Sequence, residues 1–273
     1  MYRYLFISLF AITVASPVWA ITIHSAGSTT VLPVVSAAAQ AYHASHPNVT
    51  ITVSGGGSGV GIASIVQGTA ALGMASREID EKEKAQLGDG TQVVPIAMDA
   101  VAVAVSKAVS LGGVKQLSVE QIADIYRGKI NNWKEVGGPD SRILVIDKEA
   151  SRGTRHVFAE AVLGNAHARA AGASIISGSN NEEQAIISRS NSAIGMLSNA
   201  WLNDEVRGIA VVVRGHGVLP SIEHVRDGSY PISRGLHVIL AKDAGPEVRD
   251  FVAFLLSETG QKIVEKSGYL PVR

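Results

Sequence analysis

Apolar and polar positions follow two different periodicities along the chain. Residues 49–53 are β-branched at every position, which favours a strand, and residues 62–66 begin a segment with the apolar spacing of a helix. Residues 93–97 and 101–105 are nearly continuous apolar runs, as in strands that are buried on both faces. Because strand-like and helix-like segments alternate from residue 21 onward, the pattern predicts an α/β fold.

Within the α/β class, a chain of 273 residues can form one barrel or two smaller doubly wound lobes. The long apolar segments 93–105 and 209–213 favour two lobes that are joined by extended connectors.

Three turns lead from a predicted strand into a predicted helix and are rich in glycine, hydroxyl or basic residues. The first contains Ser28 and Thr29, the second is the glycine-rich run 54–61, and the third spans residues 151–155. A helix N-terminus leaves backbone N–H groups unpaired and carries a partial positive charge, and glycine lets an anion approach the backbone closely. The three turns therefore indicate a site for a small oxyanion.

Individual side chains in these turns suit such a site. Ser58 adds a hydroxyl donor to the glycine-rich run, and Arg152 and Arg155 stand on either side of Gly153 and Thr154. Arginine suits oxyanions because its planar guanidinium donates two parallel hydrogen bonds. The alternatives are a flexible glycine loop, hydroxyls that only cap a helix, and a solvated basic surface. The repetition of the same turn composition favours the ligand interpretation.

Asp99 is the one ionisable residue in the apolar stretch 94–105. A buried carboxylate must be paired or hydrogen-bonded. Asp99 is therefore either a turn or cap residue, or an acceptor that points into a cleft.

The glycine-rich run does not fit nucleotide-binding or hydrolase motifs. Ile62 stands where a P-loop needs lysine, no register gives G-x-G-x-x-G, and Val60 breaks a nucleophile elbow around Ser58. The histidines are dispersed, and no carboxylate is placed beside His43 and His46. The sequence therefore predicts no catalytic residue, no metal site and no cofactor.

Composition restricts the partners and the location of the protein. The formal net charge of zero argues against a nucleic-acid partner, and the absence of cysteine excludes disulfides and thiolate metal sites. Arg3, the apolar run 5–14 and the small residue Ala20 are typical of a signal peptide at residues 1–20. We expect a soluble mature chain that starts near Ile21 and is periplasmic or otherwise exported; a retained N-terminal anchor is the alternative.

Five motifs in combination resemble those of a known family. They are AGSTTVLP at 26–33, GGGSGVG at 55–61, GMASR at 73–77, RGKINNW at 127–133 and SGYLP at 267–271. Together they resemble the periplasmic phosphate-binding proteins of bacterial ABC phosphate importers, over about residues 23–272. The resemblance implies a two-lobed periplasmic-binding-protein fold (type II-like), with two doubly wound lobes joined by crossover connectors. It implies that lobe one contains residues 21–97 plus 214–273 and that lobe two contains residues 98–213.

The resemblance also implies ligand-binding residues. The family's hydroxyl ligands fall on Thr29, with Ser28 beside it, and on Ser58 and Thr154, and its backbone donors fall on Gly59 and Gly153. Ser76, the serine of the third motif, is a further candidate ligand.

The chain departs from the family's pattern at three positions. Arg77 stands where relatives often have aspartate, Lys148 where they often have arginine, and Arg152 where they have serine. In the family, that aspartate accepts the proton of bound hydrogen phosphate and rejects sulfate. Asp99 is our candidate for a replacement acceptor.

The function that the resemblance implies is reversible capture of inorganic phosphate, with Arg77, Arg152 or Arg155 closing over the anion. A monomer would then deliver the phosphate to the membrane permease of an ABC importer. Three alternatives stay open: a binder or sensor of another tetrahedral oxyanion such as sulfate, a surface interaction protein with this fold, and an exported hydrolase of phosphate esters.

Overall fold

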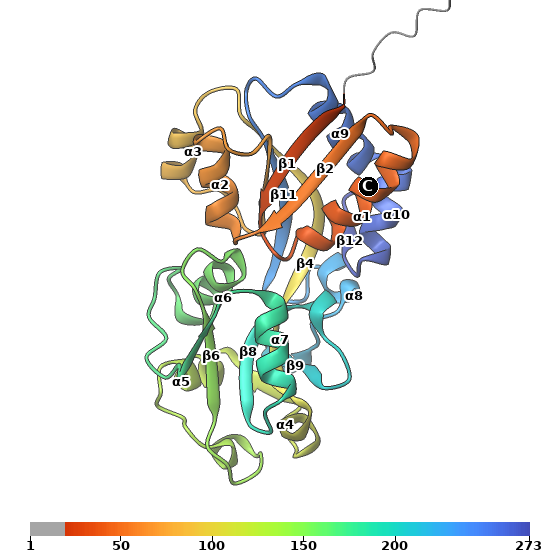
Figure 1. The fold of residues 1–273 in the computed structure, drawn as a ribbon. Coiled ribbons are helices and arrows are strands. Elements are labelled where there is room, and N and C mark those ends of the chain that lie inside the picture. Colours follow the sequence, from red (N-terminus) through yellow and green to blue (C-terminus); the bar gives the residue numbers. More distant parts are fainter. Residues whose placement is uncertain (1–19) are drawn as a thin grey trace, which may run out of the picture.

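The computed structural model describes residues 20–273, which fold into two bodies connected by extended strands (Figure 1). We call them the upper body and the lower body, after their places in Figure 1. The signal-peptide prediction for residues 1–20 lies outside the described residues, apart from Ala20. Between residues 20 and 273, no helix is both long enough and apolar enough to cross a membrane.

The upper body contains β1 (Ile21–Gly27), α1 (Leu32–Ser45), β2 (Val49–Gly55), α2 (Ser58–Val66), β3 (Leu72–Ala75), α3 (Glu81–Leu87), β11 (Ser233–Leu240), α9 (Pro246–Leu256), α10 (Glu258–Lys266) and β12 (Leu270–Pro271). The lower body contains α4 (Lys107–Leu111), β5 (Gln116–Ser118), α5 (Val119–Tyr126), the 3-10 helix η1 (Trp133–Val136), β6 (Leu144–Lys148), α6 (Gly153–Leu163), β7 (Ile175–Ser177), α7 (Asn180–Ser188), β8 (Ala193–Ser198), the 3-10 helix η2 (Asn199–Trp201), β9 (Val206–Val213), β10 (His216–Val218) and α8 (Ile222–Arg226).

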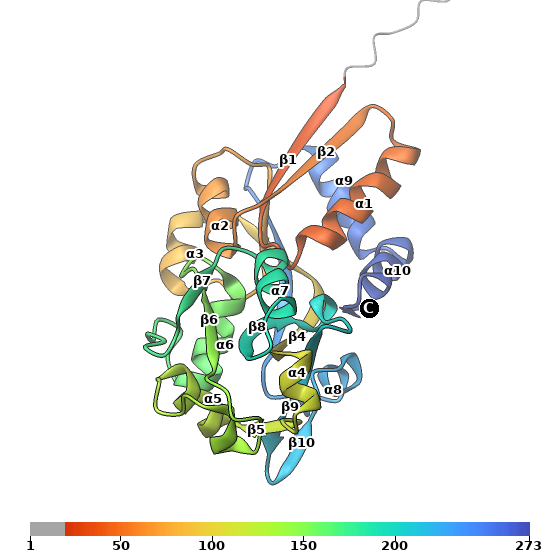
Figure 2. The same cartoon turned by 60° about the horizontal axis from the view of Figure 1, so that its bottom comes forward.

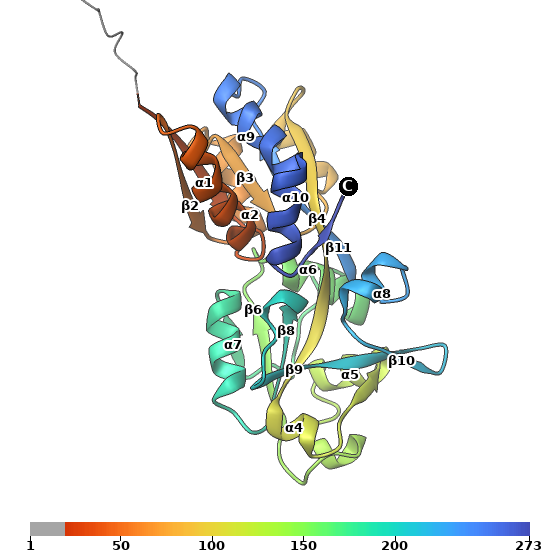
Figure 3. The same ribbon diagram turned by 90° about the vertical axis from the view of Figure 1, so that its right-hand side faces the viewer.

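Strand β4 (Gln92–Ser106) belongs to both bodies, and Figure 3 shows it running from one into the other. It pairs with β11 as far as Ala100, and with β8 and β9 from Val101 onward. The two apolar runs that flank Asp99 are therefore parts of one strand. The strand continues through Asp99 because this residue is paired in register with Arg234 of β11, whose charge neutralises the carboxylate.

The sheet of the upper body has the strand order β2-β1-β3-β11-β4, with β1 parallel to β2 and β3 and with β11 antiparallel to both of its neighbours. Helices α1, α9 and α10 cover one face of this sheet, and α2 and α3 cover the other (Figure 2). The carboxyl ends of β1 and β2 point toward the lower body (Figure 1). The turns that follow these strands therefore lie where the two bodies meet.

In the lower body, β6 lies between β7 and β8 and is parallel to both. Helices α5 and α6 pack into the larger hydrophobic cluster of this body, and α7 packs into a smaller one that contains Ile146, Ile187 and Leu197. The carboxyl end of β6 and the start of α6 face the upper body (Figure 1). Ser118 and Gln121 form a capping box at the start of α5.

Residues 214–232 were expected with residues 233–273 in lobe one, and the structure differs. Strand β10 pairs with β9, and the buried side chains of Val225, Tyr230 and Ile232 belong to the hydrophobic cluster of the lower body. The chain returns to the upper body at Ser233, where β11 begins to pair with β4. The apolar run near residue 211 is thus a strand within the lower body and not the connector.

Candidate functional site

A small polar cavity lies between the two bodies. The upper body contributes Ser28, Thr29, Thr30, Gly57 and Ser76 to its lining, and the lower body contributes Lys148, Arg152, Gly153, Thr154, Ser179 and Asn180. The cavity volume of about 10 Å³ is enough for one water-sized particle. The two bodies are therefore in a closed arrangement, in which polar side chains from both leave little free space between them.

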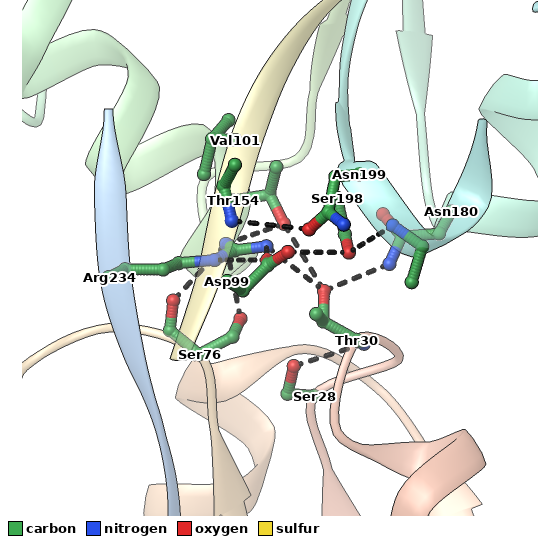
Figure 4. Close-up of polar contacts among 12 residues, drawn as sticks. Ser28, Thr30, Ser76, Asp99, Val101, Thr154, Asn180, Ser198, Asn199 and Arg234 are labelled. Carbon is green, nitrogen blue, oxygen red and sulfur yellow. Dashed lines mark hydrogen bonds and ion pairs between the residues drawn. The ribbon is translucent and has the colours of Figure 1, made fainter. Parts of the chain in front are cut away.

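Thr30 of the upper body contacts residues of the lower body (Figure 4). Asn180 donates a hydrogen bond to the Thr30 hydroxyl at 2.9 Å, and Thr154 lies 3.5 Å from the same oxygen. Arg234 donates to it as well, at 3.3 Å. Each of these donors is polar and buried, so the contacts form a network that an anion of similar hydrogen-bonding capacity could replace.

Arg234 is held in the network by Asp99 (Figure 4). Its Nε and Nη2 atoms donate to the Asp99 carboxylate at 2.8 and 2.6 Å, and Nη1 donates to the Thr154 hydroxyl at 2.9 Å. The Ser198 hydroxyl donates to the second carboxylate oxygen at 2.8 Å. Burial raises the pKa of Asp99, and the charge of Arg234 opposes this rise. Asp99 does not line the cavity, and both of its oxygens are engaged in orienting its neighbours.

Ser58 lies beside the cavity and supports one of its walls. Its hydroxyl accepts a hydrogen bond from the Ser76 backbone N–H at 3.0 Å and lies 3.4 Å from the Ser76 hydroxyl. A side chain at Gly153 would collide with both hydroxyls. Gly153, at the start of α6, therefore allows the third predicted turn to pack against Ser58 of the second turn and against Ser76.

The glycine-rich run packs against the turn between β6 and α6. The Gly59 N–H donates to the Ser151 carbonyl oxygen at 3.0 Å, and Gly57, with φ of 93°, lies against the side chain of Arg152. Arg152 in turn pairs with Glu149, at 2.9 and 2.5 Å. In this closed arrangement the Gly59 amide is used by the protein itself, whereas Arg152 lines the cavity.

Two of the predicted arginines lie outside the cavity lining. Arg77 donates to both carboxylate oxygens of Glu83 at 2.6 Å, and Arg155 donates to the carbonyl oxygens of Ala166 and Ala168 at 2.7 and 2.5 Å. Arg77 thus fixes the start of α3, and Arg155 fixes the loop after α6. The structure does not bring either of them together with the hydroxyl groups.

Three residues of the network were not selected from the sequence. Thr30 follows Thr29 in the first turn, and Asn180 is the first residue of α7, directly after its cap Ser179. Arg234 is the second residue of the largely buried strand β11 and faces the lone carboxylate of Asp99. Two oppositely charged residues in two otherwise apolar strands are a signal that could have indicated this pairing.

A second buried ion pair joins Lys148 to Glu183. Lys148 lines the cavity, and the exposed fractions of the two side chains are 1% and 0%. Burial lowers the pKa of Lys148 and raises that of Glu183, and the charge of each partner opposes the shift of the other. Among residues 20–273, no group of three His, Cys, Asp or Glu side chains is arranged to hold a metal ion.

Comparisons with known proteins identify relatives of this chain. Residues 15–259 match the model of the PBP superfamily domain. The chain is 33% identical over 250 residues to the phosphate-binding protein PstS of Bacillus subtilis, covering 90% of this chain and 79% of that protein. A crystal structure from Clostridium perfringens, described as a phosphate ABC transporter substrate-binding protein with bound phosphate, is 34% identical, with a TM-score of 0.85 over 92% of this chain and 100% of that one. An ABC-type phosphate transport receptor from Vibrio cholerae is 30% identical, with a TM-score of 0.71 over 91% and 99% of the two chains.

Proposed function

We propose that the protein binds inorganic phosphate, from the premise that the chain belongs to the PBP superfamily and, within it, to the PstS-like phosphate-binding proteins. The cavity between the two bodies is the proposed binding site, and the phosphate is delivered from it to an ABC importer. The observation that carries the proposal is the convergence of hydroxyl, amide and cationic groups from both bodies on this one cavity.

The proposed ligand-binding residues are those whose side chains or backbone line or reach the cavity. They are Ser28, Thr29, Thr30, Ser76, Lys148, Arg152, Gly153, Thr154, Asn180 and Arg234, with Ser58 supporting Ser76. Helices α6 and α7 begin at this cavity, and the first amides of each helix have no partner within the helix. Hydroxyl and amide donors together with helix N-termini suit a tetrahedral anion.

Binding requires the two bodies to separate, because the cavity has room for only one water-sized particle in this closed arrangement. We propose that the bodies are two lobes, residues 20–100 plus 233–273 and residues 101–232, with β4 and the start of β11 as the connectors. Phosphate would replace the contacts that Asn180 and Arg234 make with Thr30. Hinge closure of this kind excludes water and so strengthens each charge-assisted hydrogen bond.

A different tetrahedral oxyanion such as sulfate is the second candidate ligand, because Asp99 faces Arg234 and Ser198 and not the cavity. A transport protein and a sensor would both bind phosphate in the same way, so binding alone does not distinguish them. Loss of phosphate uptake on deletion of the gene would favour transport.

The hydrolase alternative requires a serine nucleophile with a general base beside it. Within the described chain, the hydrogen bonds of Ser28, Ser58 and Ser76 involve no histidine.

Isothermal titration of the purified protein with phosphate and with sulfate tests the proposal. We expect heat of binding with phosphate, and Thr154→Val should weaken binding by about 1–3 kcal/mol, because one buried hydroxyl partner is lost. Thr69→Val, an exposed hydroxyl outside the cavity, is the matched control and should bind as the wild type does. If neither phosphate nor sulfate gives heat of binding, the proposal is ruled out.

A further inference from the structure

Glu183 lies behind the cavity, at the far side of Lys148. It belongs to α7, which packs against β8 (Figure 3). The Met196 N–H donates to one of its carboxylate oxygens at 2.6 Å, and the Ser177 hydroxyl donates to the other at 2.8 Å. A side chain at Gly195 would collide with the carboxylate. The fold therefore holds the Glu183 carboxylate in a fixed position, with the Lys148 side chain between it and the proposed anion.

The charged groups around the cavity balance one another before any anion enters. Lys148 pairs with Glu183, Arg234 pairs with Asp99, and Arg152 pairs with Glu149. A dianion that enters therefore adds charge to a neutral, largely buried site. Charge that is buried without compensation is unfavourable, and it favours the uptake of a proton by a nearby carboxylate.

The two buried carboxylates differ in how easily they can accept such a proton. Asp99 receives two hydrogen bonds from a guanidinium that stays charged at all relevant pH values. Glu183 is paired with a lysine, and the hydroxyl of Ser177 can rotate from donor to acceptor when the carboxylate becomes a carboxylic acid. Burial already raises the pKa of Glu183. Glu183 is therefore the carboxylate that is poised for protonation.

We propose that Glu183 takes up one proton from solvent when the dianion binds, so that the charge of Lys148 is transferred from Glu183 to the anion. The proton binds to the carboxylate oxygen that faces Ser177, and no covalent bond is made or broken in the step. This inference rests on the proposed function, because it needs an anion in the cavity.

Several other groups face this pair and contribute to its electrostatics. Arg152 and Arg234 lie near enough to Lys148 to lower its pKa, and the buried phenol of Tyr126 on α5 is influenced by Glu183 and by Asp147 of β6. Of these, both arginines and Asp147 have charged partners of their own. The Tyr126 phenol stays protonated, because burial raises its pKa well above the ordinary value.

Calorimetric titration with inorganic phosphate in alkaline buffers tests the proposal, because the free anion is the dianion there and any proton that is gained on binding comes from the buffer. Buffers of different ionisation enthalpy give the number of protons taken up. For the wild type we expect about one proton per phosphate, and an affinity that falls about tenfold per pH unit. Uptake of no proton by the wild type would overturn the proposal.

Glu183→Gln imitates the protonated acid and can keep the hydrogen bonds to Met196 and Ser177. We expect this variant to take up no proton, to lose the alkaline fall in affinity, and to bind phosphate at least as tightly as the wild type. Glu182→Gln is the matched control, because it makes the same change on the exposed side of α7 and should behave as the wild type. Circular dichroism checks that each variant is folded.

Two outcomes for the folded Glu183→Gln variant would overturn the proposal. Continued proton uptake would place the proton elsewhere, for example on the bound phosphate itself. Weaker binding with an unchanged pH profile would mean that Glu183 only supports the structure. Failure of the wild type to bind phosphate at all is a separate result, which would overturn the proposed function.

Discussion

Arg77 and Arg234 are both buried and each pairs with a carboxylate, yet only Arg234 donates to a residue that lines the cavity. Arg77 follows Ser76 in the sequence but points toward Glu83 at the start of α3. Arg234 lies far from Ser76 in the sequence, but it pairs with Asp99 and donates to groups from both bodies. The comparison shows that the position of an arginine in the register of the sheet decides whether its charge faces the site. Its closeness to a motif in the sequence does not decide this.

The largest effect is expected from Arg234→Met. Removal of the guanidinium leaves the buried carboxylate of Asp99 without its charged partner, which should lower the free energy of unfolding by about 3–5 kcal/mol and abolish phosphate binding. Urea denaturation and calorimetric titration measure the two effects. If the variant binds phosphate with wild-type affinity, Arg234 has no part in the site.

The double variant Arg234→Met with Asp99→Leu separates stability from binding. Removing both charges should restore most of the lost free energy of unfolding, because no unpaired charge stays buried. Phosphate binding should stay absent, because the guanidinium that donates to Thr30 and Thr154 is still missing.

Arg77→Met tests the other half of the comparison. Glu83 has an exposed side-chain fraction of 17%, so water can hydrate it once its partner is gone. We expect a loss of about 1.5–3 kcal/mol in the free energy of unfolding, from two charge-assisted hydrogen bonds, and an unchanged affinity for phosphate. A marked loss of phosphate affinity in the folded variant would instead place Arg77 at the site and remove the contrast with Arg234.

Structural features that depend only on residues close together in the sequence could be predicted from the sequence. The strand–turn–helix units and the hydroxyl and glycine residues of the turns that contain Ser28, Thr29 and Thr154 all follow from short segments. These features depend on propensity, glycine and hydroxyl groups within a few residues of one another. A single sequence is sufficient for them.

The remaining features depend on pairing between distant segments. Asp99 interrupts an apolar run, which suggested a turn, but Arg234, 135 positions away, lets the strand continue. The return of the chain at Ser233, and not near residue 214, likewise follows from the packing of Tyr230 and Ile232 into the lower body. No local pattern specifies which strand a lone charge will face.

Ser58→Ala extends the comparison to a residue that supports the site without lining it. The variant leaves the buried Ser76 N–H without its acceptor, so we expect a loss of about 1–3 kcal/mol, measured as the free energy of unfolding. Phosphate affinity should fall as well, because Ser76 is no longer held in place. Ser54→Ala, whose hydroxyl donates to the Ser25 carbonyl near the surface, is the control and should change phosphate affinity little. Equal phosphate affinities of the wild type and Ser58→Ala would contradict the supporting role.

The smallest effect concerns Asp80, which caps the helix that presents Glu83 to Arg77. The backbone hydrogen bond from Glu83 lowers the pKa of Asp80 below its ordinary value. A lowered pKa in the folded state means that the charged cap stabilises the protein above the ordinary pKa and that this contribution is lost as the pH falls through the lowered value. Asp80→Ser keeps an oxygen at the cap without a titrating group, so the wild type should exceed it by less than about 1 kcal/mol near neutral pH. Urea unfolding midpoints should show this advantage disappear in acid, while phosphate affinity at neutral pH stays equal. A stability difference that persists below the pKa of Asp80 would mean that the carboxylate charge contributes nothing to the cap.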